Sequence, residues 1–147
     1  MAGLALAGYV YGFAIPKISQ LSKPSAPPCQ QQPINGQIIY DGREPGIGGH
    51  KIRIQNGSDG NAIIIVRDTD TGDAAVTFFV SNGETATVDG LRRGVYRVQW
   101  ALGGVLGADC ATFADTQYAS EFTKPVELRV RPVGSFRITK PSQHHAD

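Results

Sequence analysis

The sequence predicts an all-β domain, an antiparallel β-sandwich of about seven to eight strands, preceded by one N-terminal transmembrane helix. Three observations lead to this prediction. From residue 35 onward, short runs of alternating apolar and polar residues recur, as in half-buried strands. Gly, Asn and Asp turn signals separate these runs, and no convincing helical periodicity appears among them. Residues 2–15, by contrast, contain no charged side chain.

Residues 1–21 are interpreted as a membrane anchor helix. Residues 2–15 span roughly 21 Å as a helix against the roughly 30 Å of a bilayer core. Continuation through Ile18 and Leu21 would lengthen the helix, although Pro16 would kink or end it. The anchor side chains are Leu4, Leu6, Tyr9, Val10, Tyr11, Phe13 and Ile15. Two alternatives stay open, a cleaved signal peptide and a packed core helix. The first lacks a basic N-terminal region, and the second lacks a polar face.

Residues 22–34 are rich in Pro and Gln and predict a semi-extended linker that holds the domain off the membrane. Lys17 and Lys23 follow the apolar run, which favours a cytoplasmic domain by the positive-inside rule. A disulfide between Cys29 and Cys110 would instead favour an oxidising compartment, but two free thiols or pairing with another subunit are also open. We expect a single-pass protein of the inner, or cytoplasmic, membrane, with the side of the β-domain unassigned.

The β-domain is expected to cover residues 35–140, followed by a loose tail at residues 141–147. Its first strand is a short apolar run at residues 37–40. The second, at residues 51–55, alternates strictly, with two isoleucines on one face and Lys, Arg and Gln on the other. Such alternation is typical of a strand with one buried face.

The third strand, at residues 62–67, is apolar on both faces. It therefore predicts a central strand, covered on one side by the opposing sheet and on the other by a loop or a partner. A turn rich in Asp, Thr and Gly leads to a strand at residues 75–80. Asn82-Gly83 is the signal of a two-residue hairpin, and the strand at residues 85–88 follows it.

Two further turns precede a long strand at residues 95–102. The side chains of this strand that share one face are Tyr96, Val98 and Trp100. The last strands are expected at residues 126–131 and 136–139. The segment between, residues 103–124, is expected to be irregular.

Residues 87–98, TVDGLRRGVYRV, resemble a signature of small transthyretin-like and carboxypeptidase-regulatory-like domains, in which Gly-Leu, a turn and Gly-x-Tyr lead into an alternating strand. Arg92 and Arg93 stand where many such domains have two prolines. The longer run from residue 56 to residue 103 is similar to uncharacterised bacterial domains that follow a membrane segment. The resemblance implies an Ig-like or transthyretin-like sandwich that serves stability, adhesion or docking, and it assigns no catalytic residue.

Fourteen Lys and Arg against thirteen Asp and Glu leave a net charge of +1, without the basic excess that nucleic acid binding requires. The acidic run from Asp68 to Asp73 fails as a calcium loop, because Gly72 and Phe79 occupy two ligand positions. Residues 46–50 are rich in Gly but lead into a strand, so a flexible surface loop is the interpretation. We expect no enzyme activity, cofactor, metal or small-molecule ligand.

Phe78 and Phe79 are neighbours on one strand, so one of them has to face away from the core. An apolar outer face can be an interaction surface, or the segment 103–124 can fold back over it as a lid. Trp100 is either a core residue, which its alternation favours, or an exposed platform. The candidate surface residues are Phe78, Phe79, Trp100, Tyr118 and Phe122.

Together these features predict a non-catalytic, membrane-anchored accessory or docking subunit of a larger membrane protein complex. Its expected partners are the membrane and other membrane-protein subunits. A module that binds carbohydrate or another surface ligand through Trp100 and Tyr118 is the alternative. An enzyme with an unrecognised site is a third possibility.

Overall fold

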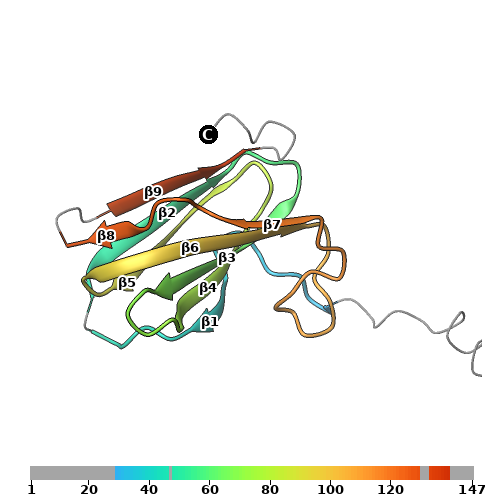
Figure 1. The fold of residues 1–147 in the computed structure, drawn as a ribbon. Helices are drawn as coiled ribbons and strands as arrows, with labels where there is room; N and C mark the ends of the chain where they lie inside the picture. The colour runs from blue at the N-terminus through green and yellow to red at the C-terminus, as the bar shows by residue number, and fades with distance from the viewer. Residues whose placement is uncertain (1–28, 47, 130–132, 140–147) are drawn as a thin grey trace, which may run out of the picture.

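Two β-sheets packed face to face make up the domain in the computed structural model (Figure 1), which describes residues 29–46, 48–129 and 133–139. These residues form nine strands and no helix, so the predicted all-β class is confirmed. In chain order the strands are β1 (Ile38–Asp41), β2 (His50–Asn56), β3 (Asn61–Asp68), β4 (Ala74–Val80), β5 (Thr85–Leu91), β6 (Gly94–Gly103), β7 (Tyr118–Glu121), β8 (Val126–Leu128) and β9 (Val133–Ile138).

Several predicted segments lie outside the described residues. They are the anchor helix at residues 1–21, residues 22–28 of the linker and the tail at residues 141–147. Among the residues that the structure describes, no helix has the length and apolar character needed to cross a bilayer.

The larger sheet has the strand order β1-β4-β3-β6-β7. Strand β8 pairs with the same edge of β6 as β7 does, but at the N-terminal end of β6. The smaller sheet has the order β5-β2-β9. All strand pairs are antiparallel except β2 with β9, which run parallel. This exception has a topological cause. Because β8 runs antiparallel to β6, the chain crosses to the smaller sheet at the end where β2 begins, and β9 then runs in the direction of β2.

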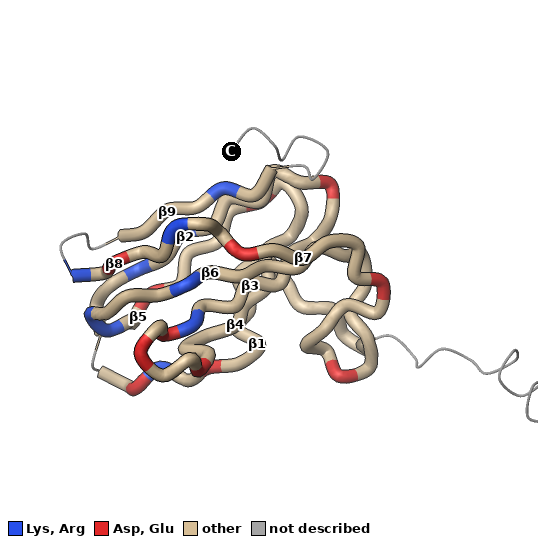
Figure 2. The backbone as a smooth tube through the Cα atoms, viewed as in Figure 1, with Lys and Arg blue, Asp and Glu red and all other residues tan. Residues whose placement is uncertain are grey.

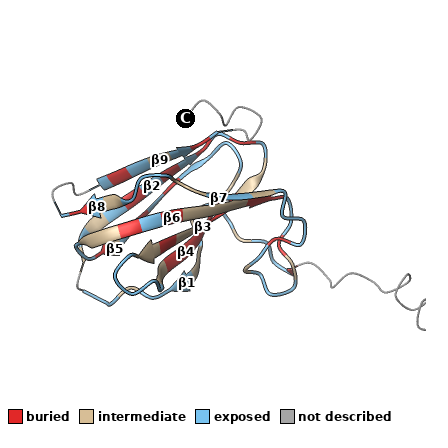
Figure 3. Ribbon diagram, in the orientation of Figure 1, coloured by how far each residue is buried: buried red, intermediate tan, exposed pale blue. Residues whose placement is uncertain are grey.

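Buried residues alternate with exposed ones along several strands of both sheets (Figure 3), and the buried side chains form the core between the layers. In β2, Ile52 and Ile54 are completely buried, whereas Lys51, Arg53 and Gln55 are exposed, which confirms the predicted alternation. The removal of each isoleucine side chain from water stabilises the folded state by about 2 kcal/mol. The same core contains residues from β3, β4, β5, β6, β8 and β9.

Strand β3 lies in the middle of the larger sheet and has both faces covered, as its two apolar faces predict. Ile64 points into the core and is fully buried. Its neighbour Ile63 points to the outer face, yet is only 4% exposed. The residues that cover Ile63 include Leu106 and Phe113, from the segment 104–117, which we call the lid.

The turn at Asn82-Gly83 exists, but it does not make a hairpin. Gly83 has a φ of 74°, as the turn requires, whereas β4 and β5 belong to different sheets. The turn is anchored to the end of β2, because the backbone N–H of Gly83 donates to the Asn56 carbonyl and that of Asn56 donates to the Glu84 carbonyl. These bonds direct β5 to pair with β2 rather than to fold back on β4.

Strand β7 is not predicted by the sequence. It lies within the segment that we expected to be irregular, and it pairs with β6 so that Ser120 is opposite Trp100. Tyr118 is its only large apolar residue, so no alternation marks it as a strand. The strand exists because the edge of β6 offers hydrogen-bonding partners.

The two ends of the sandwich differ in character. At one end, the first described residue, Cys29, donates its backbone N–H to Leu106 after the end of β6. The last strand ends there too, since the Ile138 carbonyl accepts a hydrogen bond from Gly57. The opposite end carries the turns that follow β1, β3 and β5 (Figure 1).

Candidate functional site

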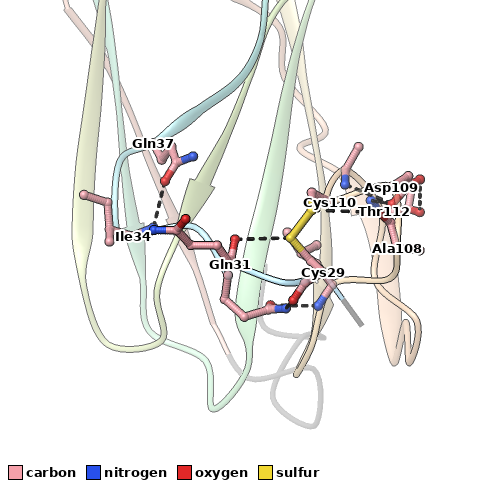
Figure 4. The surroundings of a disulfide bond; sticks show 11 residues. Cys29, Gln31, Ile34, Gln37, Ala108, Asp109, Cys110 and Thr112 are labelled. Carbon is pink, nitrogen blue, oxygen red and sulfur yellow. Dashed lines mark hydrogen bonds between the residues drawn. A yellow bond between two sulfur atoms is a disulfide. The ribbon is translucent and has the colours of Figure 1, made fainter. Parts of the chain in front are cut away.

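A disulfide bond joins Cys29 to Cys110 across 81 residues of sequence, with the two Cα atoms 4.9 Å apart (Figure 4). Among the alternatives that the sequence left open for these cysteines, the structure has the intramolecular bridge. The bond attaches residues 29–34, which we call the strap, to the lid. The last six residues of the predicted linker thus lie against the domain and are not a free spacer.

Few other contacts hold the strap. Within the described residues, two hydrogen bonds join it to the lid: Cys29 N–H to the Leu106 carbonyl and Leu106 N–H to Gln32 Oε1, both 3.0 Å. Each contributes about 1 kcal/mol net, whereas ordering one residue costs roughly 1–2 kcal/mol. The disulfide is therefore the main attachment of the strap to the lid, whereas Ile34 at the other end of the strap bonds to Gln37. Asn35, next along the chain, is held independently by hydrogen bonds to Ser81 and Thr85.

The turn around Cys110 is organised by Asp109. The Asp109 carboxylate accepts hydrogen bonds from the backbone N–H groups of Ala111 and Thr112 and from the Thr112 hydroxyl. These bonds lower the pKa of Asp109 below its ordinary value, and the bond from the Ala111 N–H has the largest effect. Cys110 itself has a φ of 56°, in the left-handed region that residues other than Gly rarely adopt. The turn leaves Cys110 exposed.

The predicted interaction surface is corrected at Phe78 and Phe79, because neither side chain reaches solvent. Phe78 lies in the core between the sheets and is 1% exposed. Phe79 lies on the outer face of the larger sheet, where it is 3% exposed beneath Leu106 and Phe113 of the lid. The sequence left two alternatives for this face, an interaction surface or a face covered by the segment 103–124, and the structure has the second.

Trp100, Tyr118 and Phe122 form a second aromatic group, away from Phe79. All three are partly buried and pack against the main core. The Trp100 ring lies 5.3 Å from the Tyr118 ring and 6.0 Å from that of Phe122. Tyr118 and Phe122 are therefore not part of the cover over the outer face. These contacts favour a packing role for Trp100 over an exposed platform for sugar.

An open cleft of about 220 Å³ lies at the end of the sandwich opposite the strap. Its lining combines charges of both signs from three turns, as Figure 2 shows for this end of the domain. The Arg92 guanidinium lies 3.7 Å from both Glu44 and Asp68. Tyr96 donates its hydroxyl to the Arg92 carbonyl at 2.7 Å, and burial raises its pKa above the ordinary value.

This cleft is not predicted by the sequence. Two of its acidic residues, Asp68 and Asp73, belong to a run whose sequence indicates a tight turn, and the third, Glu44, follows β1. Arg43 and Arg92, the cationic residues of the lining, lie 49 positions apart. Only the pairing of β1, β3 and β6 with their neighbours brings these turns together, so no local pattern marks the cleft.

Arg43 is fixed at the rim of this cleft by a carboxylate and a carbonyl. It donates two hydrogen bonds of 2.8 Å to the two oxygens of Asp41 and one of 2.7 Å to the Asp89 carbonyl. Hydrogen bonds from the Arg43 side chain and from the Arg43 backbone N–H lower the pKa of Asp41 from 3.8 to about 2. Arg43 is thus a structural residue of the rim.

This pair predicts a specific acid dependence. The folded-state pKa of Asp41 is depressed, so its contribution to stability is complete above pH 4 and is lost as the pH falls towards 2. Asp41→Asn should therefore flatten the decrease in free energy of unfolding between pH 4 and pH 2. Urea unfolding at a series of pH values measures this slope. Asp70→Asn, on the exposed β3–β4 turn, is the control, and an equal flattening in both variants would contradict the assignment.

No group of three or more His, Cys, Asp and Glu side chains in the described part of the chain is placed to hold a metal ion. His50, the first residue of β2, places Nδ1 3.3 Å from the Leu91 carbonyl oxygen. Comparison with known proteins finds no family model, no curated protein and no solved structure that matches this chain.

Proposed function

We propose that this protein is a non-catalytic docking module, tethered to a membrane through residues 1–21 and acting as an accessory subunit of a larger membrane complex. The observation that supports this proposal most directly is the Cys29–Cys110 disulfide. It joins the chain that follows the apolar head to one end of a rigid domain. A tether that is fixed in this way orients the domain as well as retaining it.

The disulfide also bears on the side of the membrane. Disulfides form and persist in oxidising compartments and are rare where thiols are kept reduced. We therefore propose that the domain lies on the oxidising side, contrary to the orientation that Lys17 and Lys23 favour. Two positive charges are a weak topological signal, whereas a structural disulfide requires oxidation.

The docking surface that we propose is the end with the cleft, because it lies farthest from the strap. The cleft presents Arg92, Glu44 and Asp68 as partly exposed charges on three turns. A mixed-charge surface of this kind selects a partner by complementarity and repels surfaces with the wrong pattern. Anchor and cleft together give two modest contacts, whose combination raises the overall affinity.

Membrane fractionation tests the tether. The full chain is expected in the membrane fraction and resistant to extraction at high pH, whereas a chain lacking residues 1–22 should be soluble. Leu6→Asp with Val10→Asp is a matched variant that keeps the length of the chain. Retention of the shortened chain in the membrane fraction would contradict the anchor.

Native mass spectrometry after mild detergent extraction tests the docking role. We expect the full chain to co-purify with another membrane protein, and Arg92→Glu to weaken this association without lowering the amount in the membrane. An isolated monomer in mild detergent would count against the accessory role.

A further inference from the structure

The Cys29–Cys110 disulfide is accessible from one side only. Cys29 is 4% exposed and belongs to the apolar cluster of Leu106 and Phe79, whereas Cys110 lies in an exposed turn. A thiolate that cleaves a disulfide has to reach one of its sulfurs from solvent. We propose that Cys110 Sγ is a thiol-exchange site, at which a dithiol reduces the bond and releases the strap from the domain. This holds whether or not residues 1–21 enter a membrane.

The exchange has two steps. A thiolate of the dithiol attacks Cys110 Sγ and forms a mixed disulfide, the bond to Cys29 breaks, and Cys29 leaves as a thiolate that takes up a proton. The second thiol of the reagent then attacks the mixed disulfide and frees the Cys110 thiol. Two electrons and two protons pass to the protein, and the dithiol becomes a disulfide. The Gln31 carbonyl oxygen, 3.2 Å from Cys29 Sγ, can accept the S–H of the new thiol.

The turn that presents Cys110 does not depend on the disulfide. Its hydrogen bonds from Cys110 N–H to Gly107, from Gly107 N–H to Thr112 and from Thr112 to Asp109 all lie within the lid. The left-handed backbone of Cys110 is therefore maintained by neighbouring residues. We therefore expect Cys110, an exposed residue in the oxidised protein, to keep its position in the mixed disulfide.

Reduction is expected to free the strap and leave the lid in place. The lid has its own attachments, since Leu106 and Phe113 are buried and the Asp115 carboxylate accepts the N–H groups of Gly104 and Val105. Within the described residues, the strap then keeps two hydrogen bonds to Leu106 of the lid, and at its C-terminal end two between Ile34 and Gln37. Release stops at the turn in which Ile34 bonds to Gln37, so five residues become free and extend the chain by at most about 17 Å at roughly 3.4 Å each.

Cysteine alkylation in two matched variants of the full chain tests the release. In Cys29→Ser, the exposed Cys110 should react with iodoacetamide at nearly the rate of the urea-unfolded chain. In Cys110→Ser, Cys29 should also react within about threefold of its unfolded rate, because the strap is free. A Cys29 that reacts about a hundredfold more slowly than in urea would show a strap that stays docked, and would overturn the proposal. Tryptophan fluorescence verifies that each variant is folded.

Amide hydrogen exchange in the unmodified chain gives a readout without mutation. Reduction should accelerate exchange at Cys29 and Leu106, whose N–H groups bond across the strap and the lid, by about a hundredfold. Gly104 and Val105, bonded to Asp115, are the internal controls and should change little. Unchanged protection at Leu106, or loss of protection throughout the domain, would each overturn a selective release.

The site of attack is tested by partial reduction of the folded chain with glutathione, followed by acid trapping and peptide mass spectrometry. We expect the trapped mixed disulfide on Cys110. Glutathione on Cys29, or a bond that reacts only after urea unfolding, would contradict an exchange site at Cys110.

Discussion

Phe79→Ala is expected to lower the free energy of unfolding by about 4 kcal/mol, as truncation of a core phenylalanine does. Phe79 is 3% exposed and fills the space between β4 and the lid, in contact with the cluster of Ile63, Leu106 and Phe113. Truncation leaves a cavity that the disulfide-bonded lid cannot collapse into completely. Urea unfolding monitored by circular dichroism measures the loss.

Tyr40→Ala is the matched control for this experiment. Tyr40 is an aromatic residue of the same sheet, on β1, but it is 53% exposed. Its replacement should change stability by at most about 0.5 kcal/mol. If Phe79→Ala were no more destabilising than Tyr40→Ala, the outer face would not be covered, and Phe79 would again be a candidate interaction residue.

Gly48→Ala is expected to cost about 3 kcal/mol or more, although the residue lies in a loop. A Cβ at this position would clash with the Leu91 carbonyl group and would lie 2.5 Å from the Arg92 backbone nitrogen. Backbone atoms of neighbouring strands cannot rotate away, so the β1–β2 loop or the β5–β6 turn has to move. Thermal unfolding of the variant should show a clearly lowered midpoint.

Gly49→Ala tests the same loop without the clash, because a Cβ there meets no atom within 4 Å. This variant should unfold at nearly the temperature of the parent chain. Equal midpoints for Gly48→Ala and Gly49→Ala would mean that the loop is as free as its glycine-rich sequence suggests. The structure instead has Gly48 packed against the turn that follows β5, so the predicted surface loop is held at this one position, while Gly46 and Gly49 are exposed.

Strand positions were predictable where the pattern is local. The alternation at residues 51–55 and the doubly apolar run at residues 62–67 correspond to β2 and β3, including which side chains are buried. Both patterns depend only on the two-residue period of a strand. Strand β7 has no such pattern, because it is a short edge strand that depends on β6 for its hydrogen bonds.

Connections between strands were less predictable than the strands. The Asn82-Gly83 turn has the backbone that its sequence implies, but its partner is the end of β2, and β5 therefore enters the other sheet. The parallel pairing of β2 with β9 also depends on a distant partner, because β8 pairs with β6 and the chain then crosses at the end where β2 begins. A turn sequence specifies local dihedral angles, whereas the sheet that a strand joins depends on distant hydrogen-bonding partners.

The sequence by itself determined that this chain contains an all-β domain, where most of its strands lie and which of their faces are apolar. These properties follow from short-range periodicity and turn chemistry, which act over a few residues. Only the tertiary structure decided that the lid covers Phe79, that Cys29 bonds to Cys110 and that three turns enclose a cleft. Each of these features joins residues far apart in the chain, and the packing of the two sheets sets their distances.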